Sequence, residues 1–429
     1  MSDFLISALA GLDPYVPGEQ PQGREYIKLN TNESPFPPSP RVLDALSREE
    51  VSHLNLYSDP TALPLRRAIA EQYGVSPDNV FCGNGSDEVL GFSFLAFADG
   101  AHPVTFPAVS YGFYRVFANL FRVPARTVPL NEDFTVPVEP FLGAGGMVVL
   151  ANPNAPTGIA LPLGEVERIV RANPDHIVLV DEAYVDFGGE SCVSLTGRYP
   201  NLLVVQTYSK SRSMAGARLG YAIGNAALIQ DLETIKFSTN PYNVNRLTLK
   251  AGAQALAEQA YYDKNCQRIM ETRAYTAREL EKLGFAVLPS QTNFLFARKP
   301  GVEGADVYRR LKERGVPVSY THLDVYKRQV RRRPHLPRRR GRAGRPPPPV
   351  QRLLHPAHVQ RGPCPAPLRL PESVRRLRRG QKYPGRHPER PGQAASVLLL
   401  RPALSQRFGR LSGRHPCPGG CLLYTSRCV

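Results

Sequence analysis

The stretch that decides the fold runs from residue 147 to residue 207. It contains three short apolar runs: MVVLA at 147–151, IVLV at 177–180 and LLVVQ at 202–206. Runs of this length, bounded by polar or turn residues, are typical of strands buried on both faces of a parallel sheet. Between the first two lies LPLGEVERIVRANPD, whose apolar residues repeat at helical spacing. The order strand–helix–strand predicts an α/β fold with a doubly wound, three-layer α/β/α domain.

The residues that follow this stretch are mostly helical in pattern. We expect helices at 226–237, 244–283 and 304–314, with a strand at 291–297 between the last two. The pattern predicts a second, smaller α+β unit, which is cut off at Val318.

The composition changes sharply after Val318. From Thr321 onward the chain has 25 Lys+Arg and 3 Asp+Glu, whereas the first 320 residues have 29 and 34. The net charge of +17 therefore comes from the tail, and the first 320 residues are mildly acidic. A tail this basic favours a nucleic-acid partner when it is taken at face value.

The two ends of this tail are related to each other. One set of codons for YTHLDVYKRQ at 320–329, when reverse-complemented, translates as CLLYTSRCV, the sequence of residues 421–429. Inverted copies of one DNA element do not arise from selection on a protein, and they resemble a sequencing adaptor read in both orientations. We therefore interpret residues 319–429 as an out-of-frame artefact. We expect this segment to be disordered and expect no nucleic-acid partner.

Cysteine usage and hydropathy bear on localisation. Cys82, Cys192 and Cys266 are widely separated and lack metal-ligand spacing, which is typical of a reducing cytoplasm and predicts no metal site. The first residues lack the basic region of a secretory signal. No apolar run approaches the roughly 18 residues that a membrane helix needs. We expect a cytoplasmic protein without a membrane partner.

Polar residues gather where the predicted strands end. Asp181 ends the run HIVLVD, and Lys210 follows LLVVQT within TYSKSRSMAGARLGY, with Arg218 eight residues later. Taken alone, Asp181 fits a helix cap and Lys210 fits a solvated surface charge. Ligands of α/β sheets, however, bind at the carboxyl ends of strands. Hydroxyls, amides and a guanidinium in one turn also suit a phosphate dianion.

Two further motifs lie upstream. FCGNGSDE at 81–88 precedes a helical segment and can present a helix amino terminus to a phosphate. NPNAPTG at 152–158 follows the first apolar run, and a rigid loop is sufficient reason for its Pro and Gly residues. Together with Tyr111 and the DEAY that begins at Asp181, these motifs resemble, in order and spacing, the fold-type-I pyridoxal-phosphate-dependent aminotransferases.

The resemblance covers about residues 10–318. Within the family, LNTNESP at 29–35, LYSDP at 56–60 and SKSRSMAGARLGYAIG look most like the histidinol-phosphate aminotransferases. The resemblance implies fold type I and a set of domain boundaries. Residues 1–45 would form an N-terminal arm and part of the small domain, 46–245 the large cofactor-binding domain, and 246–318 an incomplete small domain.

The resemblance also implies pyridoxal 5′-phosphate as the cofactor and a role for each motif residue. Lys210 would bond to the cofactor aldehyde and later move the proton during transfer. Asp181 would pair with the pyridinium nitrogen, Tyr184 would bond the phenolic oxygen of the ring, and Tyr111 would stack on its face. The cofactor phosphate would be held by Ser86, Asp87, Thr207, Ser209 and Arg218. Tyr57 would reach that phosphate from a neighbouring subunit, which implies a homodimer.

Two departures from the family pattern bear on the site. Ala155 stands where many relatives have Asn, so the bond to the ring oxygen falls to Asn154 or to Tyr184 alone. The family also places a substrate-binding arginine on a C-terminal strand, and nothing after Val318 resembles that strand. We therefore expect the cofactor site to be complete and the substrate site to lack a part.

The reaction implied is amino transfer between L-histidinol phosphate and 2-oxoglutarate, giving imidazole-acetol phosphate and glutamate in histidine biosynthesis. An aromatic-amino-acid aminotransferase and a threonine-phosphate decarboxylase are alternatives with the same cofactor. An inactive polypeptide, or a basic nucleic-acid-binding one, is the alternative from a different class.

Overall fold

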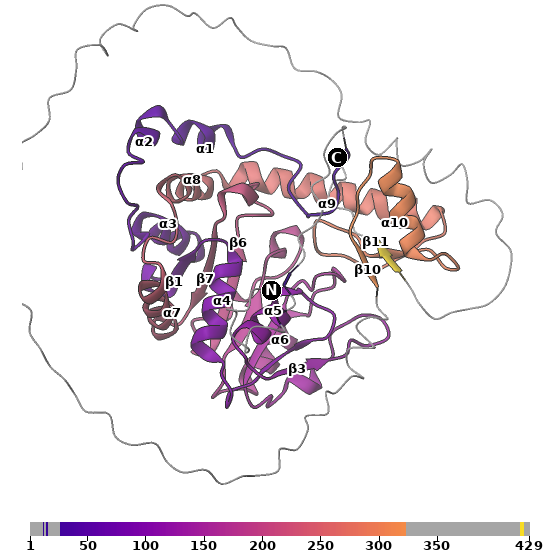
Figure 1. The fold of residues 1–429 in the computed structure, drawn as a ribbon, viewed down its shortest axis with the longest axis horizontal. Coiled ribbons are helices and arrows are strands. Elements are labelled where there is room, and N and C mark those ends of the chain that lie inside the picture. The colour runs from indigo at the N-terminus through magenta and orange to yellow at the C-terminus, as the bar shows by residue number, and fades with distance from the viewer. Residues whose placement is uncertain (1–11, 13, 16–25, 323–420, 424–429) are drawn as a thin grey trace, which may run out of the picture. The chain divides into compact units, whose positions relative to one another are not determined.

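The computed structural model describes residues 12, 14–15, 26–322 and 421–423 of the chain, and these residues confirm the expected α/β architecture. A seven-stranded sheet has the order β1-β7-β6-β5-β4-β2-β3 (Figure 1). Its strands are β1 (Val80–Gly83), β2 (Val104–Pro107), β3 (Ala125–Val128), β4 (Met147–Ala151), β5 (Val178–Asp181), β6 (Leu202–Thr207) and β7 (Gly220–Gly224).

The three apolar runs of the sequence are the central strands β4, β5 and β6, as predicted. These strands are parallel to one another, and β2 and β3 extend the parallel set on one side. On the other side β7 is antiparallel to both β6 and β1. The parallel strands place their carboxyl ends at one edge of the sheet, where ligands of such sheets bind.

Alternate residues of each central strand enter two different cores. In β4, Val148 and Leu150 join one buried cluster, whereas Met147 and Val149 join the other. Helices α3, α6 and α8 contribute to the first cluster, and α4, α5 and α7 to the second. Both faces of the sheet are therefore covered, which is why the strands are apolar throughout rather than alternating.

The helices follow the predicted pattern with one difference. The expected helix at 244–283 is two helices that meet at Glu258, a residue outside helical geometry at φ −107°. The helices are α1 (Pro40–Ala45), α2 (Arg48–Ser52), α3 (Leu63–Tyr73), α4 (Ser86–Phe97), α5 (Phe113–Leu120), α6 (Leu163–Arg171), α7 (Ala226–Thr239), α8 (Arg246–Ala257), α9 (Gln259–Lys282) and α10 (Gly304–Glu313).

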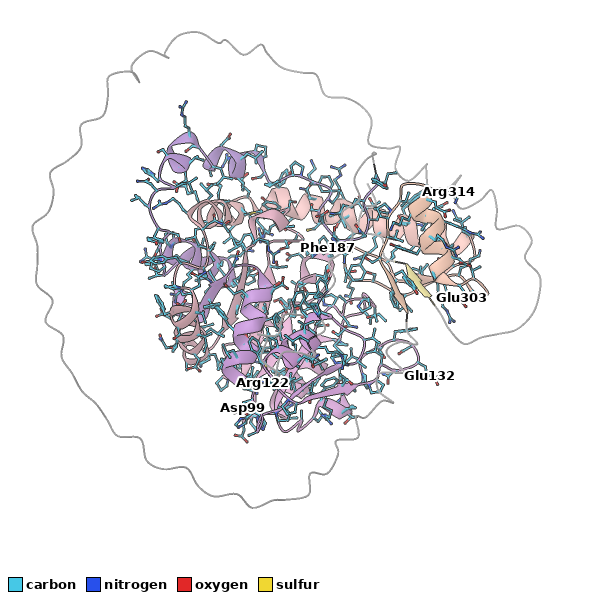
Figure 2. All side chains as sticks on the ribbon, viewed as in Figure 1. Asp99, Arg122, Glu132, Phe187, Glu303 and Arg314 are labelled. Carbon is cyan, nitrogen blue, oxygen red and sulfur yellow. The ribbon has the colours of Figure 1, made fainter. Side chains whose placement is uncertain are left out.

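The long helix α9 runs from the α8 side of the molecule to the α10 side (Figure 1). It packs on the short 3-10 turn η4 (Val185–Phe187), which follows the loop 182–184 at the end of β5. Phe187 is buried there against Cys266 and Ile269 and is labelled in Figure 2. A loop that begins next to Asp181 is thus anchored on a long, rigid helix.

A second, smaller sheet has the order β10-β11-β9-β8. Its strands are β8 (Ala286–Val287), β9 (Ala297–Arg298), β10 (Tyr320–His322) and β11 (Cys421–Leu423). The strand expected at 291–297 is wrong over most of its length, because hydroxyls turn the chain back on itself. Thr292 Oγ1 accepts a hydrogen bond from the backbone nitrogen of Phe294. The hydroxyls of Thr292 and Ser290 both lie within donating distance of the backbone oxygen of Phe294.

The expected disorder of residues 319–429 is wrong for two short segments. Strand β10 pairs with β11, and β11 also pairs with β9. An edge strand presents unpaired backbone groups, and an extended segment can satisfy them with little regard to its sequence. The other residues of that interval, 323–420 and 424–429, lie outside the described residues.

The second sheet has its own core, which includes an N-terminal residue. Leu29 is fully buried in a cluster with Phe285, Val307 and Leu311. Among the described residues, no helix is long and apolar enough to cross a membrane.

Candidate functional site

A cavity opens at the carboxyl ends of β4, β5 and β6 and has an empty volume of about 620 Å³, part of it open to solvent. Asp181 is the last residue of β5 and Thr207 the last of β6, while Lys210 lies in the turn after β6. Nine of the residues singled out from the sequence line this cavity: Ser86, Asp87, Tyr111, Asp181, Tyr184, Thr207, Ser209, Lys210 and Arg218. Side chains up to 132 positions apart in the sequence therefore meet in one place.

Lys210 is half-buried at the floor of the cavity. Its Nζ donates to the backbone oxygen of Thr31 at 3.2 Å and lies 5.6 Å from the ring centre of Tyr184. Burial lowers the pKa of the Lys210 amine to about 8, although the carboxylates of Glu33 and Asp87 act in the opposite direction. An amine with this pKa is partly neutral near neutral pH, which is the form that attacks an aldehyde and accepts a proton.

Asp181 is a buried carboxylate held from two sides. Tyr114 donates its hydroxyl to Oδ2 at 2.8 Å, and the backbone nitrogen of Ala183 donates to Oδ1 at 3.2 Å. Burial raises the pKa of Asp181 to about 6, and the two hydrogen bonds limit that rise. Asp181 is thus charged at neutral pH and ready to pair with a positively charged group in the cavity.

One end of the cavity has the character of an anion site. Helix α4 begins there with Ser86, and no side chain caps its amino terminus. The Arg218 guanidinium lies 3.0 Å from Asp87, which also accepts a bond from the Tyr111 hydroxyl at 2.8 Å. A helix amino terminus beside an arginine binds phosphate groups well.

Close backbone contact shapes this end. A Cβ on Gly220 would clash with the backbone nitrogen of Ser86, so β7 and the start of α4 can approach this closely only with glycine at that position. Gly85 has φ +84°, and a Cβ there would meet the Arg218 guanidinium at 2.5 Å. The two glycines therefore make the room in which the helix terminus and Arg218 come together.

Thr207 and Ser209 add hydroxyls to the same end. Thr207 Oγ1 accepts from the backbone nitrogen of Ser209 at 3.1 Å and donates to Ser209 Oγ at 3.0 Å. Thr207 Oγ1 also lies 3.3 Å from the backbone oxygen of Leu219, which is a second acceptor for its single hydrogen. The donor set of helix amides, hydroxyls and a guanidinium fits a phosphate ester.

The two rings of the site are held differently. Tyr184 accepts a hydrogen bond from Asn32 Nδ2 at 3.1 Å, and burial raises the pKa of its phenol to about 12. Burial likewise raises the pKa of Tyr111, whose ring meets Tyr114 edge-on at 5.7 Å between centres. Both phenols are therefore protonated at neutral pH, and Tyr111 donates its hydroxyl to Asp87.

Two predicted residues are not brought into the cavity. Asn154 is buried with its amide committed: Nδ2 donates to Val109 O and to Thr157 Oγ1, and Oδ1 accepts from Ser110. Its neighbour Ala155 lines the cavity instead. Of the two possibilities left open for the ring oxygen, the geometry favours Tyr184 alone.

Tyr57 is the other residue outside the cavity. Its side chain is 78% exposed and stacks on Tyr242 at 4.4 Å between ring centres. A residue so placed cannot contact the cavity of its own chain, so its predicted contact with a neighbouring subunit stays a prediction.

Sequence reasoning missed two residues that hold the site. Tyr114 lies in the first turn of α5, three positions after Tyr111, which precedes that helix, and the motif around Tyr111 does not indicate a second inward-facing phenol. Asn32 lies within the LNTNESP motif, but nothing in the motif indicates that its side chain reaches Tyr184, 152 positions away. Among the described residues, no group of three or more His, Cys, Asp or Glu could hold a metal ion.

Known proteins resemble this chain in sequence over most of their length. Residues 24–332 match the family described as aminotransferase class I and II. A histidinol-phosphate aminotransferase of Marinomonas sp. (strain MWYL1) is 49% identical over 322 residues, which cover 75% of this chain and 91% of the relative. One from Chromohalobacter salexigens is 50% identical over 320 residues, covering 75% and 91%.

Solved structures of similar fold include two from the same group. The crystal structure of histidinol-phosphate aminotransferase from Sinorhizobium meliloti in complex with pyridoxal-5′-phosphate has a TM-score of 0.64 and 28% identity, over 68% of this chain and 82% of that one. A putative histidinol-phosphate aminotransferase from Erwinia carotovora atroseptica SCRI1043 has a TM-score of 0.64 and 25% identity, over 68% and 87%. These similarities confirm the fold expected from the resemblance.

Proposed function

Because the chain belongs to the class I and II aminotransferase family, we propose that it transfers an amino group between L-histidinol phosphate and 2-oxoglutarate with pyridoxal 5′-phosphate as cofactor. The products are imidazole-acetol phosphate and glutamate. One observation carries the chemistry: Lys210 and Asp181 line the same cavity as Arg218 and the start of α4, which are suited to a phosphate. The names of the relatives at 45–50% identity support the choice of substrate.

The cofactor fits the cavity group by group. Its phosphate would lie at the amino terminus of α4, against Arg218 and the Thr207 and Ser209 hydroxyls. Asp181 would hold the proton on the ring nitrogen, and Tyr184 would donate its hydroxyl to the ring oxygen. When bound, the cofactor supplies a ring that withdraws electrons from the substrate carbon.

The chain's own residues would perform the proton chemistry. Lys210, with a pKa of about 8, would bond to the cofactor and then, as a free amine, take a proton from the substrate carbon that bears the amino group and deliver it to the cofactor. Tyr111 would cover the ring face and keep water away from it. The charge on Asp181 would keep the ring nitrogen protonated throughout.

We also propose that the protein is a cytoplasmic homodimer. Tyr57, Leu54 and Leu56 are large apolar side chains that are each more than half exposed within one short segment. A second copy would cover them, and it would allow Tyr57 to reach the partner's phosphate end. Cys82, Cys192 and Cys266 are free and buried, which suits a reducing compartment.

The proposal is tested by incubating the full chain and pyridoxal 5′-phosphate with 2-oxoglutarate and one amino donor at a time. Glutamate should form with L-histidinol phosphate and should be absent in Lys210→Ala. Glutamate from phenylalanine but not from histidinol phosphate would assign the chain to the aromatic-amino-acid alternative. Carbon dioxide released from threonine phosphate would favour the decarboxylase.

A further inference from the structure

The N-terminal segment 27–33 connects the residues that follow α10 to two side chains of the cavity, Lys210 and Tyr184. Backbone bonds attach Ile27 to Gly315 at 2.9 Å and Leu29 to Pro317 at 3.0 Å. Two residues after Leu29, the Thr31 carbonyl accepts from Lys210, and the next side chain, Asn32, donates to Tyr184. The segment therefore reaches the cavity from a region separate from the seven-stranded sheet.

Asn32 occupies this position at an energetic cost. Its backbone has φ +53°, in the left-handed region that Asn tolerates better than most residues. Its side chain is only 8% exposed, and among the described residues its Oδ1 is buried without a hydrogen-bond partner. The backbone at this position is held by Asn293, whose Nδ2 donates to the backbone carbonyl oxygen of Asn32 at 3.2 Å. A residue kept with an unsatisfied buried acceptor calls for a functional reason.

The hydrogen bond to Tyr184 supplies that reason. A phenol has one hydrogen and can accept at its oxygen. Since the Asn32 amide donates to that oxygen, the hydrogen of Tyr184 is left for an acceptor in the cavity. Accepting a bond also makes the phenol a stronger donor, because hydrogen bonds in a chain polarise one another.

We propose that Asn32 is a positioning residue that orients and strengthens the hydroxyl of Tyr184 as a donor to the ring oxygen of the bound cofactor. The proposal rests on the proposed function. A ring oxygen that receives a stronger hydrogen bond holds the neighbouring proton of the cofactor–lysine linkage less tightly. Asn32 thus acts, through Tyr184, on the pH at which the cofactor absorbance changes.

Other charges face the same phenol and act on it independently of Asn32. Asp181 and Asp87 both raise the pKa of Tyr184, and Lys210 lies 5.6 Å from its ring centre. Variants that leave these three residues unchanged therefore isolate the contribution of the amide.

The test is a pH titration of the visible absorbance of the cofactor-loaded full chain. Asn32→Gly removes the amide and keeps the left-handed backbone, which glycine adopts freely. We expect the midpoint to rise by about 0.5–1 pH unit. Asn32→Asp has the same shape but can only accept when ionised, so Tyr184 would turn its hydrogen to it; here we expect a rise of about 1 unit or more.

Two controls make the result decisive. Arg122→Gly introduces glycine at another left-handed residue, φ +58°, which is exposed, outside the cavity and labelled in Figure 2, and it should not move the midpoint. In a Tyr184→Phe background, Asn32→Gly should cause no further shift, because the phenol through which it acts is gone.

Two results would overturn the inference while leaving the proposed function intact. One is a cofactor-loaded Asn32→Gly protein whose absorbance midpoint equals that of the parent. The other is an Asn32→Gly shift in this midpoint that is equal with and without the Tyr184 hydroxyl. If the parent chain develops no cofactor absorbance, the proposed function fails and the inference fails with it.

Discussion

Replacing Tyr114 by Phe should change the pH dependence of amino transfer, because the Tyr114 hydroxyl donates a hydrogen bond to the buried Asp181 carboxylate. At 2.8 Å this bond is shorter than the 3.2 Å bond from the backbone nitrogen of Ala183. The ring of Tyr114 is fully buried, and phenylalanine keeps it. A hydrogen bond to a charged group contributes about 1.5–3 kcal/mol, which corresponds to about 1–2 pKa units. The pKa of Asp181, about 6 in the parent, should therefore rise to about 7–8.

The assay is kcat between pH 5.5 and 9 for parent, Tyr114→Phe and Tyr111→Phe. The protonated ring nitrogen of a bound cofactor would lower the pKa of Asp181 in all three proteins. The difference in this pKa between the parent and each variant would remain. We expect the acid limb of Tyr114→Phe to lie about 1–2 pH units above that of the parent, and the loss of kcat to disappear as the pH rises. Tyr111→Phe, which loses a bond to Asp87 instead, should keep the parent's acid limb. A uniform loss at every pH would refute the reasoning.

Three further predictions follow from the same geometry. The pKa of Asp181 in the folded chain lies above its unfolded value of 3.8, so the native state binds the extra proton and loses stability as the pH rises through about 6. Urea unfolding of cofactor-free Asp181→Asn should show its stability relative to the parent increasing by about 2.5 kcal/mol from pH 4 to pH 8, and a constant difference would contradict this. Gly220→Ala should cost about 1–3 kcal/mol in the same assay and weaken cofactor binding, because its Cβ meets the Ser86 backbone; unchanged stability would show that β7 can move away. Arg218→Gln should weaken cofactor binding about 10- to 100-fold by equilibrium dialysis, and an unchanged dissociation constant would exclude Arg218 from the phosphate site.

The sequence predicted the centre of the fold better than its edges. Strands β4, β5 and β6 are buried on both faces, so every position is apolar and the pattern is visible without context. Strand β7 begins and ends with glycine, and β1 ends in the Gly-rich turn, so neither shows a comparable run. Their pairing depends on the close approach at Gly220, which is a property of the packed structure.

The site was predictable where a motif residue lies at a strand end. Asp181 and Lys210 are placed by the parallel strands that precede them, so their meeting follows from topology. Asn154 lies in a loop whose side-chain directions depend on partners such as Ser110, and residue type alone could not show that its amide is committed. Tyr114 and Asn32 support other side chains from distant segments, which a linear motif does not reveal.

The most direct test of the central claim is reductive trapping of the cofactor on the chain. The full protein is loaded with pyridoxal 5′-phosphate, treated with borohydride and digested, and the modified peptide is identified by mass spectrometry. We predict a pyridoxyl group on Lys210 of the parent and no label at that position in Lys210→Ala. The peptide around Lys236, a buried lysine outside the cavity, should be unmodified in both proteins. A label on another lysine, or no stable label in the parent, would contradict the claim.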